Sequence, residues 1–121
     1  MQVAVGRLKN RPEFLRVAAA RRKWVAPGLI LQARASEPAD DSPVCRVGFT
    51  ATRKIGNAVV RNRARRRLRA AVQTVMPAHA KPGYDYVLIA RGETARRPYP
   101  ALLGDLSEAL RRLGAWRDAA S

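Results

Sequence analysis

Acidic residues are scarce in this chain of 121 residues. Nine Asp and Glu stand against 24 Lys and Arg, which gives a formal net charge of +15. A charge of that size repels itself in the folded state, so it indicates a polyanionic partner, with nucleic acid the first candidate and an anionic membrane surface the second. No apolar run approaches the roughly 18 residues of a membrane-spanning helix, and no stretch typical of a signal peptide follows the N-terminus. The nucleic-acid interpretation is therefore the stronger one.

Cysteine and histidine are nearly absent as well. Cys45 is the only cysteine, which excludes an internal disulfide and leaves a cytoplasmic location as the expectation. His79 is the only histidine, and no paired carboxylates, Cys/His pair or glycine-rich phosphate loop accompanies it. Asp40 and Asp41 could hold a divalent cation, but an exposed acidic loop is the simpler interpretation. The sequence therefore predicts neither a metal site nor catalytic residues.

The length and the apolar content favour one domain over residues 1–121, with an ordered core at about 7–114. Apolar residues make up 47% of the chain, enough to build a core. Their periodicity predicts the order helix, strand, strand, basic helix, strand, helix. That order is typical of an α+β fold, and we expect a two-layer sandwich of three helices against a small mixed sheet of about four strands.

The first expected helix begins near residue 10. Asn10 and Glu13 have the spacing of a capping box, and Phe14, Val17 and Ala18 then share one face of the helix. Aromatic residues are few, at 6% of the chain. Phe14 is therefore of interest either as a packing residue or as the wall of a groove.

Three strands are expected at 24–33, 44–52 and 84–91, with a further short edge strand near 23–35 that the pattern does not place. The segment 44–52 alternates clearly. One of its faces is core, with Cys45, Val47, Phe49 and Ala51. The other face is small and polar and carries Val44, Arg46, Gly48, Thr50 and Thr52. Such a face is unusual for a buried surface and suits one that meets a ligand.

The most distinctive segment is an arginine-rich helix, expected to begin after Asn57 and to end at Met76 before Pro77. Six arginines fall within residues 61–69, and no Asp or Glu occurs between Ser42 and Tyr84. Guanidinium groups bind phosphates through paired hydrogen bonds, which lysine does not do. The amide of Asn62 suits a sugar hydroxyl or a base edge, or it is a neutral spacer. The segment predicts a polyanion-binding surface rather than a merely solvated face.

Three stretches resemble one known family. Residues 46–71, "RVGFTATRKIGNAVVRNRARRRLRAA", resemble the signature region of the bacterial ribonuclease P protein subunit, with "KIGNAV" leading into Arg61, Asn62 and Arg63 and the continuing basic helix. "RLKNRPEF" (7–14) resembles the N-terminal stretch of that family, and "DYVLIAR" (85–91) resembles its late strand. The resemblance covers residues 7 to 113, and its central motif is highly specific.

The resemblance implies an α/β sandwich with a left-handed βαβ crossover, contrary to the usual rule. It also implies a protein that binds the catalytic RNA of ribonuclease P and helps to remove the 5′ leader of precursor tRNA. The RNA would perform the hydrolysis with bound Mg²⁺, so the protein would be the non-catalytic subunit of an endoribonuclease and would hold no cofactor itself. The expected partners are the catalytic RNA and precursor tRNA, without a membrane or a protein partner.

The resemblance implies two sets of site residues. The catalytic RNA would be contacted by Arg53, Lys54, Arg61, Asn62, Arg63, Arg65, Arg66, Arg67 and Arg69. A cleft between the first helix and the sheet would hold the single-stranded leader against Phe14, Val17, Ala18, Arg46, Thr50 and Thr52. Where relatives commonly have a second aromatic residue, this chain has Ala18, so we expect the cleft to stack fewer bases and to rely more on arginine. A basic ribosome-associated structural protein is the alternative function, ahead of a protein-only nuclease.

Overall fold

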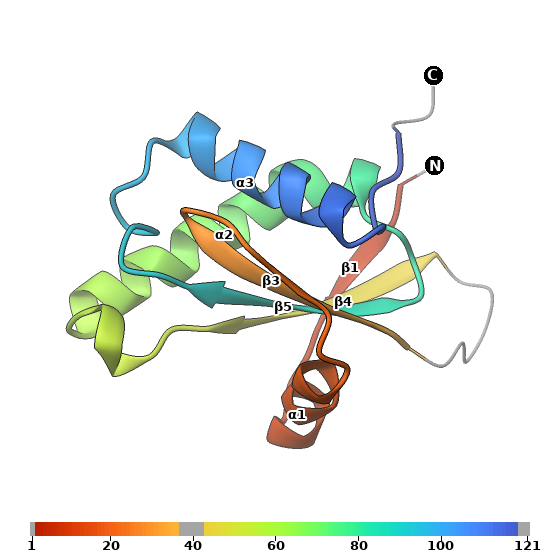
Figure 1. The fold of residues 1–121 in the computed structure, drawn as a ribbon, viewed down its shortest axis with the longest axis horizontal. Helices are drawn as coiled ribbons and strands as arrows, with labels where there is room; N and C mark the ends of the chain where they lie inside the picture. The colour runs from red at the N-terminus through yellow and green to blue at the C-terminus, as the bar shows by residue number, and fades with distance from the viewer. Residues whose placement is uncertain (1, 37–42, 119–121) are drawn as a thin grey trace.

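The computed structural model describes residues 2–36 and 43–118. Along the chain the elements are β1 (Ala4–Arg7), α1 (Arg11–Ala19), β2 (Lys23–Val25), β3 (Leu29–Ala35), β4 (Val44–Thr50), the 3-10 turn η1 (Arg53–Ile55), α2 (Ala58–His79), β5 (Tyr84–Ala90) and α3 (Tyr99–Arg112). The strands form one sheet, with α2 and α3 on one face and α1 on the other (Figure 1). The predicted α+β class, with three helices and a mixed sheet, is confirmed.

The sheet differs from the expectation in two respects. It has five strands rather than about four, and helices cover both of its faces rather than forming a single layer. β1 was not predicted, because its four residues show no clear apolar alternation and gain their hydrogen bonds by pairing in parallel with β4. The segment expected as one strand at 24–33 is a hairpin, in which β2 pairs antiparallel with β3. β2 is the short edge strand that the sequence did not place.

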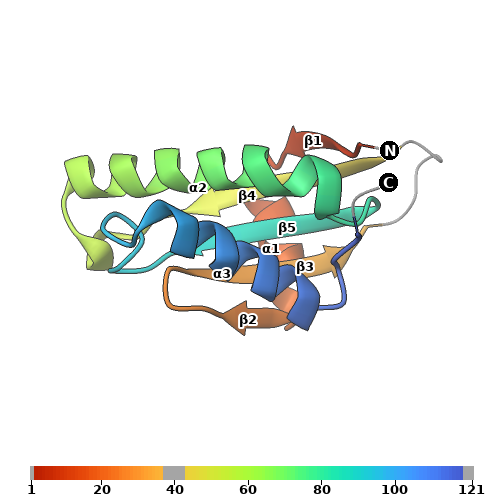
Figure 2. The same cartoon turned by 90° about the horizontal axis from the view of Figure 1, so that it is seen from above.

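The strand order is β1-β4-β5-β3-β2, and β4 and β5 are parallel neighbours joined through α2. Figure 2 shows β4 and β5 pointing the same way with α2 on the near side of the sheet, and the path from β4 through α2 to β5 is left-handed. This agrees with the expected crossover. The crossover places the arginine-rich helix over β1, β4 and β5, beside α3.

The ends of α2 show what limits the helix. The side chain of Asn57 accepts a hydrogen bond from the backbone N–H of Val60, as the cap prediction required. The predicted end at Met76 is wrong, because the helix continues through Pro77 to His79. Proline removes only one backbone donor, and the last carbonyl groups find another partner. Arg117 donates to the carbonyl oxygens of Pro77, Ala78 and Ala80.

The two faces of the sheet bury different amounts of apolar surface. The larger core lies between the sheet and α2 and α3, and it includes Leu68, Val72, Leu106 and Leu110 among many others. The core under α1 has only three buried residues, Leu8, Val17 and Val87, with Phe14 and Ile89 packed beside them. The α1 side is therefore shallow, and its helix edge stays accessible.

Candidate nucleic-acid interface

The arginines of α2 lack acidic partners. Within residues 2–36 and 43–118, every ion pair uses an arginine outside α2, and these arginines are Arg46, Arg96, Arg97 and Arg112. An arginine without a carboxylate keeps its charge available for an incoming anion. The helix is thus the region of the described chain where positive charge is concentrated and not neutralised.

A groove runs between α2 and the open edge of β4. β1 pairs with β4 only as far as Arg7 opposite Val47, so the edge of β4 has no neighbouring strand from Gly48 onward. The groove has a volume of about 380 Å³ and is lined by Arg7, Leu8, Lys9, Phe14, Val47, Gly48, Phe49, Arg65 and Arg69. It therefore joins α1, the end of β1, β4 and α2 in one hollow, and its basic lining residues come from β1, the segment after it and α2.

The two phenylalanines of the groove are held differently. An added Cβ at Gly48 would lie 2.4 Å from Cζ of Phe14, so the glycine provides the space in which the Phe14 ring rests on β4. Phe49 is half-buried on the main core, and the guanidinium carbon of Arg69 lies 5.8 Å from the centre of its ring. Each ring is anchored on the protein and contributes to the wall of the groove.

A second hollow, of about 660 Å³, lies on α2 itself and is lined by Val59, Asn62, Arg65, Arg66 and Arg69. The amide oxygen of Asn62 accepts a hydrogen bond of 3.3 Å from Arg65, and Arg65 also donates to the carbonyl oxygen of Ala51 at 3.4 Å. Both distances are long, so these bonds orient Arg65 without consuming its capacity to bind an anion. Asn62 thus orients Arg65. This role is additional to the two that the sequence suggested, a contact with a sugar or base and a neutral spacer.

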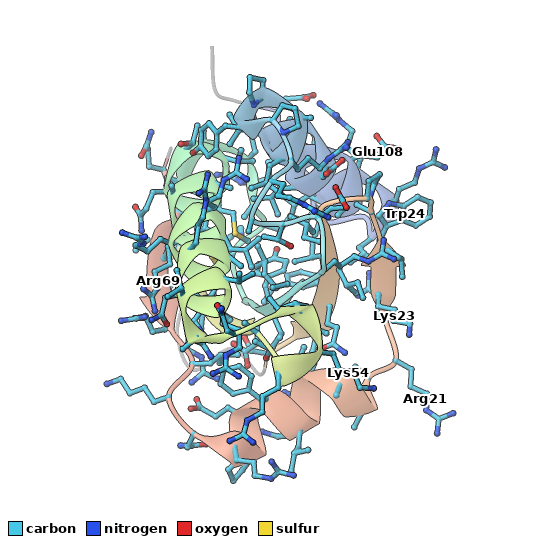
Figure 3. The ribbon with its side chains drawn as sticks, turned by 90° about the vertical axis from the view of Figure 1, so that its left-hand side faces the viewer. Arg21, Lys23, Trp24, Lys54, Arg69 and Glu108 are labelled. Carbon is cyan, nitrogen blue, oxygen red and sulfur yellow. The ribbon has the colours of Figure 1, made fainter. Side chains whose placement is uncertain are left out.

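The residues predicted to contact the catalytic RNA are mostly accessible. Arg53, Lys54, Asn62, Arg63, Arg66 and Arg69 are exposed, and Arg61 and Arg65 are half-buried. Figure 3 shows Arg69 on the outer side of α2, on the opposite side of the molecule from Lys23 and Trp24 of β2. Arg67 is half-buried as well, and both of its terminal nitrogens donate to carbonyl oxygens of the loop before α3.

Of the six residues predicted for the leader cleft, Phe14 alone lines the groove. Thr50 is half-buried, and Ala18 and Thr52 are exposed. Val17 has no exposed surface and belongs to the small core under α1, so it supports the helix rather than lining the cleft. The helical pattern put Phe14 and Val17 on one face. Only the structure shows that Phe14 lines the groove whereas Val17 is buried beneath the helix.

All three guanidinium nitrogens of Arg46 donate hydrogen bonds to carboxylates. Its guanidinium donates to both carboxylate oxygens of Asp85, at 3.0 and 2.9 Å, and to Glu13 at 2.6 Å. Glu13 also accepts hydrogen bonds from the backbone N–H groups of Lys9 and Asn10. These backbone bonds first, and the charge of Arg46 next, hold the pKa of Glu13 below its usual value. The cluster therefore fixes the start of α1, and with it Phe14, against the sheet.

Three residues that line the groove were not among the site residues that the sequence predicted: Arg7, Lys9 and Phe49. Arg7 and Lys9 lie in the stretch "RLKNRPEF" that carried part of the family resemblance, so a signal was present. Phe49 was assigned to the core from strand alternation, and it does pack there while one part of it reaches the groove.

Among the residues that the structure describes, no group of three His, Cys, Asp or Glu side chains could hold a metal ion. Asp40 and Asp41, the candidate cation ligands of the sequence analysis, lie outside the described residues. None of the described helices is long and apolar enough to cross a membrane.

A basic helix beside a groove that carries aromatic and arginine side chains defines an RNA-binding protein of the α+β class. The family model for Ribonuclease P matches residues 4–114. The ribonuclease P protein component of Paramagnetospirillum magneticum is 60% identical over 116 residues, which cover 95% of this chain and 87% of the relative. That of Gluconacetobacter diazotrophicus is 54% identical, over 89% of this chain and 90% of the relative. The chain belongs to the ribonuclease P protein component family.

Solved structures agree on the fold. The ribonuclease P protein of Staphylococcus aureus superimposes with a TM-score of 0.74 at 21% identity, covering 92% of this chain and 97% of that one. The protein from Thermotoga maritima gives a TM-score of 0.69 at 23% identity, covering 88% of this chain and 96% of that one.

Family membership brings a role in tRNA processing, as part of an endoribonuclease complex with ribonuclease P RNA. The ribosome-associated alternative gains no support.

Proposed function

We propose that this protein binds the catalytic RNA of ribonuclease P through the arginines of α2 and holds the single-stranded 5′ leader of precursor tRNA in the groove beside it. The observation that carries this proposal is the groove itself, where Arg65 and Arg69, which make no ion pair with a described carboxylate, face a wall that contains Phe14.

The chemistry of α2 suits an RNA backbone. Phosphate oxygens accept paired hydrogen bonds from guanidinium groups, and neutralising each phosphate releases counterions. Arg66 and Arg69 are exposed on the helix, and Arg65 is oriented by Asn62. With about six phosphates neutralised, the logarithm of the binding constant should fall with the logarithm of salt concentration with a slope of roughly −4 to −5.

The groove suits a single strand rather than a duplex. Proteins that bind single strands combine a basic channel with aromatic rings on which bases stack. Here Arg7 and Lys9, from β1 and the segment after it, line the channel together with Arg65 and Arg69 of α2 and Phe14 of α1. Ala18 is exposed and offers no second ring on α1, which supports a leader site that depends on arginine and on few stacking contacts.

The protein contributes binding and positioning, and the RNA subunit performs the hydrolysis with Mg²⁺. The side chains described here support that division of labour. Nδ1 of His79 donates a 2.8 Å hydrogen bond to the carbonyl oxygen of Arg117. The ring of His79 stacks on the ring of Trp116, with 4.0 Å between the two ring centres. It therefore serves the end of α2 and does not face the groove. A cytoplasmic location follows if the protein works in this complex.

The test is cleavage of precursor tRNA by a bacterial ribonuclease P RNA at low magnesium concentration, with and without the protein. We expect strong rescue of cleavage by the protein and no cleavage by the protein alone. Tight RNA binding without rescue would contradict the proposed role in leader processing, and cleavage without any RNA would contradict the division of labour.

A further inference from the structure

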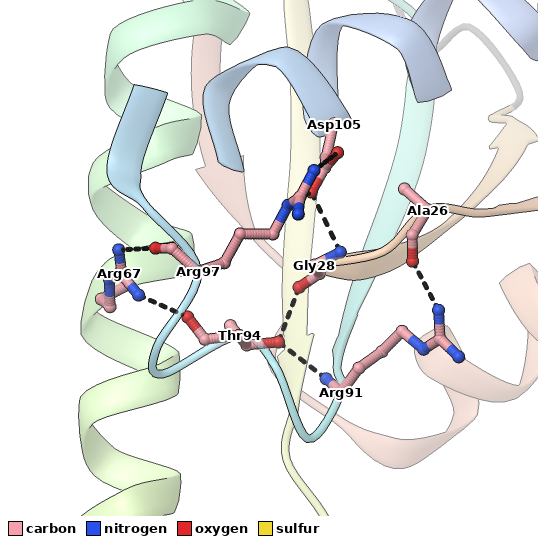
Figure 4. Close-up of polar contacts among 7 residues, drawn as sticks. All are labelled: Ala26, Gly28, Arg67, Arg91, Thr94, Arg97 and Asp105. Carbon is pink, nitrogen blue, oxygen red and sulfur yellow. Dashed lines mark hydrogen bonds and ion pairs between the residues drawn. The ribbon is translucent and has the colours of Figure 1, made fainter. Parts of the chain in front are cut away.

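Both terminal nitrogens of Arg67 donate short hydrogen bonds to backbone carbonyl groups, whereas the two hydrogen bonds of Arg65 are 3.3 and 3.4 Å long. Nη1 donates to the carbonyl oxygen of Thr94 at 2.7 Å, and Nη2 donates to the carbonyl oxygen of Arg97 (Figure 4). Both acceptors belong to the loop between β5 and α3. The fork of the guanidinium thus bridges two carbonyl groups of one loop, and the side chain is half-buried between the helix and that loop.

The loop that Arg67 holds is itself anchored by a buried hydroxyl. Thr94 has no exposed surface, and its Oγ1 accepts a 2.7 Å hydrogen bond from the backbone N–H of Arg91. The same hydroxyl donates to the carbonyl oxygen of Gly28 at 2.6 Å. The loop is in this way tied to the turn between β2 and β3, which is 66 residues away in the chain.

A buried carboxylate completes the connection. Asp105 of α3 is 7% exposed, accepts a 2.9 Å hydrogen bond from the backbone N–H of Gly28, and pairs with Arg97 at 2.5 and 3.0 Å. No described buried side-chain nitrogen or oxygen lacks a partner. A fully satisfied buried network is rigid, whereas one with a missing member leaves desolvated groups unpaired. We call these residues the clamp: Gly28, Arg67, Thr94, Arg97 and Asp105.

We propose that Arg67 is a positioning residue rather than an RNA contact. It joins α2 to the clamp on the flank opposite Arg65 and Arg69, and this attachment sets the rotation of α2 about its axis, so that those two arginines face the groove. The part of this inference that concerns RNA rests on the proposed function, while the clamp itself is a property of the protein alone.

The first test compares Arg67→Lys and Arg67→Met with the same changes at Arg66, which is exposed and makes no described hydrogen bond or ion pair. Lysine keeps the charge but lacks the fork that reaches two carbonyl groups. We expect both Arg67 variants to lower the melting temperature by about 5 °C and the Arg66 variants to leave it unchanged. Amide exchange should accelerate at residues 94–97 only in the Arg67 variants. Unchanged melting and exchange in Arg67→Lys would overturn the clamp.

Binding of the variants to ribonuclease P RNA distinguishes a positioning role of Arg67 from a direct phosphate contact. If Arg67 bound a phosphate, Arg67→Met would make the salt slope less negative by about 0.7, as Arg66→Met should. A phosphate contact would leave the slope of Arg67→Lys, which keeps the charge, near that of the wild type. A positioning residue should change the slope equally in both variants, because Arg65 and Arg69 are displaced in both. A reduced slope in Arg67→Met alone would overturn the inference. Arg69→Ala should cost less affinity in the Arg67→Lys background than in the wild type, because a misplaced Arg69 has less to lose. Strictly additive effects would refute the positioning role and leave Arg67 a stability residue.

Thr94→Val provides a second variant in case Arg67→Met does not fold. Thr94 is fully buried and cannot reach RNA, so Thr94→Val should reproduce the faster exchange, the lower melting temperature and the changed salt slope of the Arg67 variants. No change in exchange at residues 94–97 would contradict the clamp. Failure of wild-type protein to bind or rescue the RNA would instead refute the proposed function, and the melting and exchange measurements would still decide the clamp.

Discussion

The two flanks of α2 use the same residue type for different purposes. On the groove flank, Arg65 makes only two long hydrogen bonds and Arg69 makes a contact with the ring of Phe49. On the opposite flank, Arg67 is bound by two loop carbonyl groups. The three residues lie within five positions of one helix. Their neighbours in space, rather than their own chemistry, decide which guanidinium is free to meet an anion.

The carbonyl-bound state of arginine recurs in other parts of the described chain. Arg91 donates to the carbonyl oxygen of Ala26 at 2.7 Å, and Arg117 donates to the carbonyl oxygen of Ala80 at 2.8 Å. Nine acids cannot pair with 24 basic residues, so backbone oxygens take over as acceptors. A highly basic composition is therefore compatible with arginines that stabilise the fold as well as with arginines that bind RNA.

The largest expected effect is a loss of stability when the clamp on the Arg67 flank is disrupted. An added Cβ at Gly28 would lie 2.6 Å from a carboxylate oxygen of Asp105 and 2.8 Å from Leu102. We expect Gly28→Ala to lower the free energy of unfolding by about 3 kcal/mol, because overpacking displaces the buried carboxylate. Urea denaturation measures this. Gly104→Ala is the matched control, since a Cβ there meets no atom within 4 Å, and it should not destabilise α3.

The next largest effect is a loss of RNA binding when the arginines of the groove flank are removed. Replacing Arg65 and Arg69 together by alanine should weaken RNA binding and make the salt slope less negative by about 1.4, as expected for two lost phosphate contacts. The melting temperature should hardly change. Titrations at several salt concentrations test this, with Lys23→Ala as the control on the far edge of the sheet (Figure 3). An unaltered slope would place the RNA elsewhere on the protein.

A third change sharpens the assignment of the groove to the leader. Phe14→Ala should reduce affinity for precursor tRNA by about 1–3 kcal/mol, the value of one base–aromatic stacking contact, and should leave affinity for mature tRNA unchanged. The comparison of the two RNAs removes any general loss of stability. Leu15→Ala is the control, because Leu15 is 53% exposed and does not line the groove. Equal losses for both RNAs would remove Phe14 from the leader site.

The smallest effect concerns acid stability at the start of α1. The pKa of Glu13 is lowered in the folded state, so its stabilising contribution is complete above its unfolded value of about 4.3 and is lost as the pH falls through the lower folded value. Melting temperatures between about pH 3 and pH 6 should show this loss in the wild type. Glu13→Gln should flatten that part of the profile, and an identical profile in the variant would exclude Glu13 as its source.

Local signals in the sequence were sufficient for much of the fold. The capping box at Asn10 and Glu13 and the cap at Asn57 were predicted correctly, because a cap depends on residues three positions apart. The periodicity of the apolar residues also predicted a helix in this segment, and Ala64, Leu68 and Val72 on it are buried. β1 was missed, and the helix end at Pro77 was misplaced, because both depend on partners far along the chain.

The sequence by itself determined that the protein is basic, that its arginines share one helix and which family it resembles. Only the tertiary structure decided which of those arginines remain available. Arg67 finds its acceptors 27 and 30 residues later in the chain, and Arg65 and Arg69 reach a groove whose other walls come from β1, α1 and β4. A long, flexible guanidinium side chain takes whichever acceptor the folded chain brings within reach, and helical periodicity does not contain that information.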